Sequence, residues 1–100
     1  MGASGSSIVV EDNAKVGTRA ILVTGFHEYS TDPPCVAKGG KHADIRVCAG
    51  AVVSTGVTVL PGITVNAMSH VVAGAVVTHD VPAYHRVGGI PARPIRDLRD

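Results

Sequence analysis

One hundred residues allow a single small domain, which buries only a modest part of its surface and gains from contact with a partner chain. The formal charge of +1 argues against a general polyanion-binding surface such as that of a nucleic-acid-binding protein. Hydrophobic residues make up 45% of the chain but include only three aromatic ones, so the interior has to be built from Val, Ile, Leu and Ala.

The N-terminal segment, residues 1–7, is rich in Gly and Ser and has neither the basic region nor the apolar core of a signal peptide. We expect it to be flexible. From residue 8 a six-residue period begins, with Val10, Val16 and Leu22 in step. Gly17 follows Val16 where such a repeat favours a residue that tolerates a tight bend. No apolar run approaches the roughly eighteen residues of a membrane span, so no membrane partner is expected.

The period then breaks, because Val47 comes 25 residues after Leu22, one more than four hexads. The segment at about 25–44 contains Pro-Pro and Gly-Gly pairs, which disfavour regular structure and predict an excursion loop that leaves the repeat. A long loop on a rigid repeat is a common place for functional residues.

The stretch from Val47 to Val81 keeps the six-residue period without a slip. A helix returns its apolar face after three or four residues and a half-buried strand after two, so this period predicts another geometry. In a hexapeptide β-helix, three six-residue units make one triangular coil, and residues three hexads apart lie on top of one another. The stacked inward pairs are then Val47 on Val65, Val53 on Val71 and Val59 on Val77.

We therefore predict an all-β chain, a parallel β-helix of hexapeptide repeats with about three to four coils over residues 8–89. Pro82 ends the regular pattern by removing a backbone donor. Residues 90–100 are expected to form a C-terminal tail that makes at best a helical turn or two.

Three blocks in the second half resemble the hexapeptide-repeat acyltransferases, closest to the maltose, galactoside and nodulation-factor O-acetyltransferases. The blocks are residues 59–64 (VLPGIT), 71–82 (VVAGAVVTHDVP) and 88–93 (GGIPAR). The resemblance implies left-handed coils, acetyl-CoA as the acyl donor, and a homotrimer whose active sites lie between neighbouring chains. The order of the blocks after the loop favours this branch over the serine acetyltransferases.

His27, at the start of the predicted loop, matches the position at which this family carries a catalytic base. An alcohol is a poor nucleophile until its proton is being removed, and imidazole titrates near neutral pH. The resemblance therefore implies direct acetyl transfer to a sugar or other small hydroxyl acceptor, without a covalent enzyme intermediate. A competing mechanism would use Cys35 or Cys48 as an acyl-carrying nucleophile, but no His lies at a spacing that marks a Cys–His pair. These two cysteines also lack zinc-site spacing, and a reducing cytoplasm is the expected location.

The resemblance also assigns a set of residues to coenzyme A. Thr55 would offer its backbone amide near the thioester, with Ala73 one coil on along the pantetheine arm. The nucleotide end and its phosphates would meet Thr78, His79, Arg93 and Arg96. The chain departs from the family pattern at three points: Val52 stands where relatives often have Trp, His79 stands where they have Lys, and residues 65–70 lack the usual Gly-Asp/Glu-Asn bend.

Two other classes stay open. A gamma-type carbonic anhydrase shares the prism and needs three imidazoles that converge on zinc. The chain has five histidines, but His70 and His79 are expected on different faces, and no pair has the close spacing of that family's ligands, so no metal is predicted. A non-catalytic or truncated β-helix assembly module is the other alternative, since relatives usually carry more chain before residue 8. The residues do not identify the acceptor.

Overall fold

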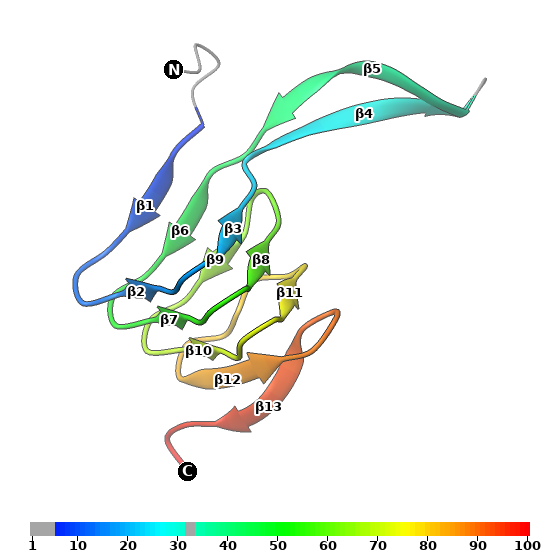
Figure 1. The fold of residues 1–100 in the computed structure, drawn as a ribbon. Coiled ribbons are helices and arrows are strands. Elements are labelled where there is room, and N and C mark those ends of the chain that lie inside the picture. The colour runs from blue at the N-terminus through cyan, green and yellow to red at the C-terminus, as the bar shows by residue number, and fades with distance from the viewer. Residues whose placement is uncertain (1–5, 32–33) are drawn as a thin grey trace.

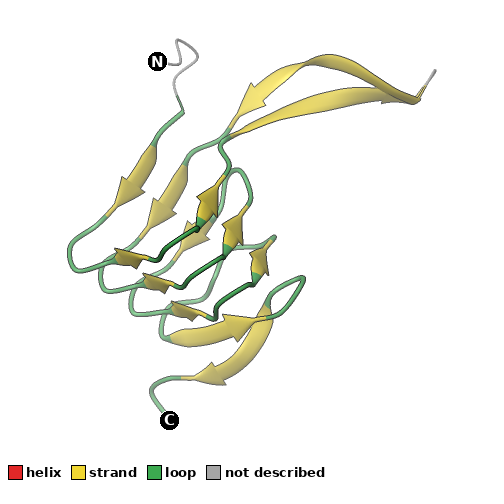
Figure 2. Cartoon of the chain, in the orientation of Figure 1, coloured by secondary structure: helices red, strands yellow, loops and turns green. Residues whose placement is uncertain are grey.

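The computed structural model describes residues 6–31 and 34–100, with residues 26–31 and 34–41 described through their backbone. The described part consists of strands and turns without a helix, and therefore includes no helix long and apolar enough to cross a membrane (Figure 2). The predicted all-β class is confirmed.

The chain winds through successive coils of three short strands each (Figure 1). The first coil contains β1 (Ile8–Val10), β2 (Lys15–Val16) and β3 (Ile21–Leu22). The second contains β6 (Ile45–Val47), β7 (Val52–Val53) and β8 (Thr58–Val59). The third contains β9 (Thr64–Val65), β10 (His70–Val71) and β11 (Val76–Val77). A partial fourth coil contains β12 (His85–Gly88), followed by β13 (Arg93–Asp97).

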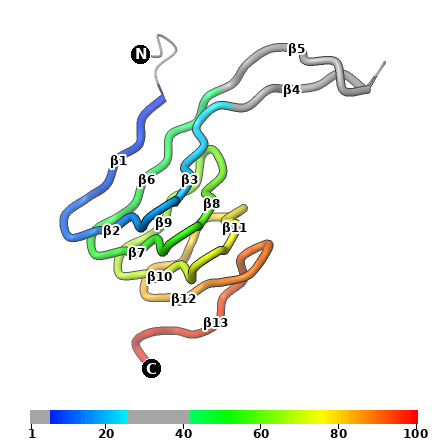
Figure 3. The backbone as a smooth tube through the Cα atoms, in the orientation of Figure 1, coloured from blue at the N-terminus to red at the C-terminus, as the bar shows by residue number. Residues whose placement is uncertain are grey.

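Strands at the same place in successive coils pair in parallel and form three walls of a left-handed prism. Wall A has the order β1-β6-β9, wall C has the order β11-β8-β3, and wall B has the order β13-β12-β10-β7-β2. Figure 3 shows the coils of backbone lying directly above one another. The predicted parallel β-helix of three to four coils is confirmed.

The inward valines explain why these short strands stay together. Val53 lies in register with Val71 on wall B, and Val59 lies in register with Val77 on wall C. These side chains are almost completely buried, with at most 1% of their surface exposed. Successive side chains of a strand point to opposite faces, so each two-residue strand sends one side chain inward and one outward. The six-residue period of the sequence follows from this arrangement, because each strand and bend together take six residues and place one side chain inward.

Most corners of the coils have one residue with a left-handed backbone. Gly50 has φ 70° and donates its amide hydrogen to the carbonyl oxygen of Asp12 at 3.0 Å. One coil on, Met68 takes the same role with φ 58°, and its amide donates to the Ala49 carbonyl at 3.0 Å. A non-glycine residue in this region costs roughly 1–2 kcal/mol. The hexad that lacks the usual bend residues therefore bends in the same way, at a cost that the ladders on either side offset.

The excursion is a regular hairpin and not the irregular loop predicted from its Pro-Pro and Gly-Gly pairs. Strands β4 (Gly25–Thr31) and β5 (Pro34–His42) pair antiparallel and project away from the coils (Figure 1). The predicted excursion from the coils is confirmed, but the expectation of irregular backbone was wrong, because each strand of an isolated ribbon has only one partner. A proline at the end of such a ribbon loses no central ladder bond, and the two register shifts in this hairpin absorb irregular positions.

The C-terminal tail also differs from prediction. Instead of a helical turn, residues 93–97 form β13, which pairs antiparallel with β12. Without β13, strand β12 would be the edge of wall B, and its unpaired backbone groups are a template for another strand. The tail therefore extends wall B over the C-terminal end of the prism.

Candidate functional site

The corner between walls B and C presents two backbone amides from adjacent coils. Thr55 follows β7, Ala73 follows β10, and the amide of Gly74 donates to the Thr55 carbonyl oxygen at 3.0 Å, which holds the two bends together. Thr55 and Ala73 are both exposed. Among residues 6–31 and 34–100, no acceptor is found for the amide hydrogen of either one.

Another corner shows where such an amide donates its hydrogen when an oxygen is near. Ala49 occupies the equivalent place between walls A and B, and its amide donates to Oε1 of Glu11 at 3.1 Å. A ligand carbonyl or oxyanion at the Thr55 corner would meet the same kind of donor. Thr55 and Ala73, which the sequence predicted to lie one above the other, therefore present two stacked backbone donors along one corner of the prism.

Gly17 keeps the Thr55 amide uncovered. The sequence suggested that a glycine is needed here for a tight bend. The backbone of Gly17 is outside the left-handed region, so the bend does not require glycine. A Cβ atom at Gly17 would lie 2.8 Å from the backbone nitrogen of Thr55 and 2.9 Å from the carbonyl carbon of Ser54. Any other residue here would crowd the Thr55 amide. Glycine is required at this position because there is no space for a Cβ atom.

A chain of polar side chains lies on the outer face of wall B. The Oγ of Ser54 lies 3.0 Å from Nε2 of His70, and Nε of Arg86 donates to Nδ1 of the same ring at 3.3 Å. All three side chains are half-buried. The register of β7, β10 and β12 sets this contact, because His70 lies between Val52 and Arg86. Sequence reasoning gave His70 no role, although it lies three hexads after Val52.

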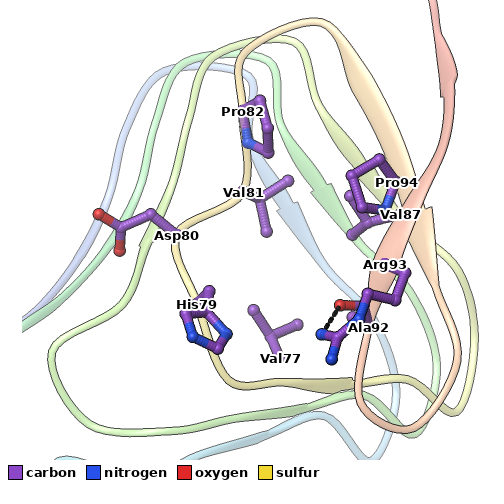
Figure 4. Close-up of a pocket in the computed structure, with 9 residues that line it drawn as sticks. All are labelled: Val77, His79, Asp80, Val81, Pro82, Val87, Ala92, Arg93 and Pro94. Atoms are coloured by element: carbon purple, nitrogen blue, oxygen red, sulfur yellow. Dashed lines mark hydrogen bonds between the residues drawn. The ribbon is translucent and has the colours of Figure 1, made fainter.

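The C-terminal end of the prism holds a hollow of about 200 Å³. Its floor is apolar, with Val77, Val81 and Val87 from the coils and Ala92 and Pro94 from the segment that covers them (Figure 4). The polar residues at its edge are His79, Asp80 and Arg93.

The edge residues of this hollow differ in how they are held. Asp80 accepts a hydrogen bond from the amide of Thr64 at 2.8 Å, so it fastens a bend and points away from the hollow in Figure 4. The ring of His79 contacts Oγ1 of Thr78 at 3.0 Å, while Nη1 of Arg93 donates to the carbonyl oxygen of Ala92 at 3.2 Å. His79 and Arg93, which were assigned to the nucleotide end of a cofactor, therefore both line this hollow, and Thr78, assigned to the same end, contacts the His79 ring beside it.

Arg96 lies elsewhere. It faces Arg86 across the antiparallel pair β12–β13, and its guanidinium donates to the carbonyl oxygen of Asp100 at 3.3 Å. The predicted cofactor residues thus form three groups: the corner with Thr55, the hollow with Arg93, and wall B with Arg96. His27 lies in β4 in register with Gly40, and its side chain is outside the described residues.

Cys48 does not support the competing thiol mechanism. Burial raises the pKa of its thiol, and the carboxylate of Glu11 raises it further, while Arg46 acts in the opposite direction. A raised pKa keeps the sulfur protonated, and a protonated thiol is a poor nucleophile. Cys35 lies in the part of β5 whose side chains are not described. In the described part of the chain, no three His, Cys, Asp or Glu side chains gather so that they could hold a metal ion.

No family model matches this sequence, but curated relatives and solved structures do. The serine acetyltransferase of Bacillus subtilis is 35% identical over 91 residues, which cover 91% of this chain and 40% of the relative. A provisionally named acetyltransferase of Schizosaccharomyces pombe is 46% identical over 95 residues, 93% of this chain and 44% of the relative. A galactoside acetyltransferase in complex with coenzyme A superposes with a TM-score of 0.80 at 22% identity, over 91% of this chain and 45% of the other. The chain has the repeat and the fold of the hexapeptide-repeat acyltransferases.

This hexapeptide-repeat chain spans about two fifths of the length of the curated relatives that it matches. Their names include the serine branch of the acyltransferases, whereas the solved structure belongs to the galactoside branch. The preference for the galactoside branch, taken from the order of the sequence blocks, stays a prediction.

Proposed function

We propose that this chain is the β-helical part of an acetyl-CoA-dependent O-acetyltransferase that acts on a sugar or another small hydroxyl compound. The observation that carries the proposal is the pair of amides at Thr55 and Ala73, on stacked coils, for which the described residues provide no acceptor. The pantetheine arm of coenzyme A carries amide carbonyls, and the thioester carries another carbonyl, so a row of backbone donors suits this ligand. The names of the relatives and the coenzyme A bound to a structural neighbour support the same donor.

The reaction is direct transfer. His27 accepts the proton of the acceptor hydroxyl as that oxygen attacks the thioester carbonyl carbon, and the amide of Thr55 donates to the oxygen that becomes negative. The carbon–sulfur bond then breaks, and the thiolate of coenzyme A takes the proton back from the imidazolium. A positioned base contributes about 10²- to 10⁴-fold, and alignment of the two substrates supplies much of the rest.

The phosphate-bearing end of the cofactor is assigned to Thr78, His79, Arg93 and Arg96. The guanidinium of Arg93 is exposed and bonds only to the carbonyl of the preceding residue within the described chain, so its remaining donors are open to a phosphate. A planar guanidinium offers two parallel donors to phosphate oxygens, which suits this role.

A homotrimer in the cytoplasm completes the proposal. The hairpin projects away from the coils of its own chain, so a neighbouring chain is the natural source of the donor groove that His27 serves. Sedimentation or light scattering at several protein concentrations measures the number of chains, and a monomer that turns over substrate contradicts the shared site.

His27→Ala tests the catalytic role. Turnover of labelled acetyl-CoA is measured against sugars, amino sugars and serine, and we expect kcat to fall about 10²- to 10⁴-fold while acetyl-CoA binding persists. His85→Gln is the matched control and is expected to keep full activity, because the one side-chain hydrogen bond of His85 among the described residues is to the carbonyl oxygen of Ala83. Unchanged turnover in His27→Ala shows that another group is the base.

A non-catalytic assembly module is the second candidate. It is favoured by the apolar side chains that the first coil leaves exposed, among them Val10, Val16 and Ile21. Titration with millimolar acetyl-CoA separates the two functions, since the module shows no saturable binding and the enzyme does.

A further inference from the structure

The polar chain on wall B ends at the residue that precedes Thr55. We propose that the Ser54 hydroxyl is a second hydrogen-bond donor to the thioester carbonyl oxygen, and that His70 and Arg86 hold it in its donating orientation. The inference rests on the proposed acetyl transfer and adds three residues to it. Ser54 would be catalytic, because it touches the reacting group, while His70 and Arg86 would be positioning residues.

The direction of the hydrogen bonds follows from the chemistry of the groups. A guanidinium can only donate, so Nδ1 of His70, which lies 3.3 Å from Nε of Arg86, is an acceptor without a hydrogen. The neutral ring then carries its hydrogen on Nε2, and that hydrogen is donated to Oγ of Ser54 at 3.0 Å. The hydroxyl hydrogen of Ser54 is left over, and the described residues provide no acceptor for it. It is available to a ligand.

The location suits the thioester oxygen. Ser54 and Thr55 are consecutive, and Gly17 leaves space over both, since a Cβ there would lie 2.9 Å from the carbonyl carbon of Ser54 and 2.8 Å from the nitrogen of Thr55. Ser54 is half-buried, whereas Thr55 is exposed at the corner. A donor that is partly removed from water and fixed before the reaction stabilises developing charge more than a mobile one does.

Arg86, at the other end of this row of hydrogen-bonded side chains, adds positive charge. The described residues give Arg86 no ion pair, and Arg96 stands opposite it in the antiparallel pair. Like charges directly opposite one another are unfavourable in a sheet. An uncompensated cation at the end of a donor chain polarises each hydrogen bond toward Ser54, and this is the sign that an oxyanion requires.

The same tautomer excludes a serine nucleophile. A base that activates a serine has to accept the hydroxyl proton, but Nε2 of His70 already carries a hydrogen. The usual partner of the other ring nitrogen in such a triad is a carboxylate, and here it is the guanidinium of Arg86. Ser54 therefore carries no acetyl group at any stage.

Three variants test the inference by kinetics. Ser54→Ala removes the donor, and we expect kcat to fall about 10²-fold with the KM for acetyl-CoA unchanged. His70→Leu breaks the relay and lowers kcat less, about tenfold. His70→Gln retains most of the activity, because its amide oxygen accepts from Arg86 and its amide nitrogen donates to Ser54. Equal loss in His70→Leu and His70→Gln contradicts the relay.

A spectroscopic readout separates this donor from a merely structural role. In the His27→Ala background, the carbonyl stretch of bound [1-13C]acetyl-CoA reports hydrogen bonding to the thioester oxygen. Addition of Ser54→Ala moves this band to higher frequency if the hydroxyl donates to it, and an unmoved band overturns the inference. Thermal unfolding of each variant checks that the coils remain folded.

The two proposals fail in different ways. If the unaltered protein neither binds nor consumes acetyl-CoA, the proposed function and this inference fall together. If it turns over and depends on His27, but Ser54→Ala keeps its kcat, only the inference is wrong. Mass spectrometry of the protein during turnover provides a further check, because an acetylated Ser54 would also overturn it.

Discussion

The two ends of the prism have similar inward residues, but these residues are buried to different extents. At the N-terminal end, Val16 is stacked on Val53 and yet is 41% exposed, whereas Val53 is fully buried. At the C-terminal end, Val87 closes wall B with only 3% exposed, because β13 and the segment before it lie over it. Burial in a solenoid comes from the coils above and below each residue. An inward position is therefore buried only when it has a neighbour on both sides.

The largest expected effect compares the middle of the ladder with its open end. Val53→Ala leaves a cavity between two coils and is expected to lower the free energy of unfolding by about 2–3 kcal/mol. Val16→Ala at the open end should cost less than about 1 kcal/mol, because water already reaches this side chain. Urea unfolding of both variants at one protein concentration measures the difference. Equal losses would mean that another surface covers the first coil in solution.

The second comparison uses glycines at equivalent places on wall B. A Cβ at Gly17 would meet backbone atoms of the next coil, the nearest at 2.8 Å, whereas a Cβ at Gly88 would meet Cδ1 of Ile95 at 2.9 Å and Cβ of Val72 at 3.1 Å. Ile95 is an exposed side chain that can turn aside, but a neighbouring backbone cannot. We expect Gly17→Ala to cost about 2 kcal/mol and Gly88→Ala less than about 1 kcal/mol.

The same pair of variants also reports on the site. Gly17→Ala covers the Thr55 amide and is expected to weaken acetyl-CoA binding more than Gly88→Ala, which lies opposite Arg93 and away from this amide. Calorimetric titration of each folded variant measures this. Equal affinity in the two variants would show that the cofactor does not use the Thr55 corner.

The smallest expected effect concerns the C-terminal end alone. Hydrogen bonds from Arg99 hold the pKa of Asp97 well below its ordinary value of 3.8. A lowered pKa in the folded state stabilises the fold above the ordinary pKa, and this contribution is lost as the pH falls toward the folded value. Arg99 is exposed and Asp97 is only half-buried, so solvent screening keeps the effect small. Asp97→Asn should lower the Tm slightly at pH 7, and the gap from the unaltered protein should narrow below about pH 4.

A gap in Tm that stays constant between pH 7 and pH 3 would contradict this ion pair. Asp44→Asn is the control, because it removes a carboxylate that has no part in the Asp97–Arg99 ion pair. Asp44 lies at the other end of the molecule and accepts a hydrogen bond from the amide of Ser7.

Much of the fold could be predicted from particular residues. The valines from Val47 to Val77 recur every sixth position, and a period of six with inward stacking leaves few geometries. The hairpin was missed, because Pro34 and the paired glycines at 39–40 carry the signals of a loop, and only the pairing of two strands with each other overrides them. β13 was missed for a similar reason. Its sequence is polar, and it is a strand only because β12 leaves an edge.

The site was predicted in part. Thr55 and Ala73 were assigned to one surface by their spacing and by resemblance, and the structure stacks them at one corner. The relay through Ser54, His70 and Arg86 could not be found in this way. Its members are 16 residues apart at each step, not a multiple of the hexad. Ser54 and His70 meet diagonally across adjacent strands, whereas His70 and Arg86 are directly opposite because β12 enters the sheet two residues earlier than the hexad predicts.

The sequence by itself determined the coil, since an apolar residue at every sixth place can be buried only if three short strands close a turn and the turns stack. The tertiary structure decided which inward residues lose contact with water, which edge the tail covers, and which polar groups meet on wall B. Those outcomes depend on contacts between residues of different coils, and a periodic pattern is the same in every coil. Only the positions of the ends and of the hairpin distinguish one coil from the next.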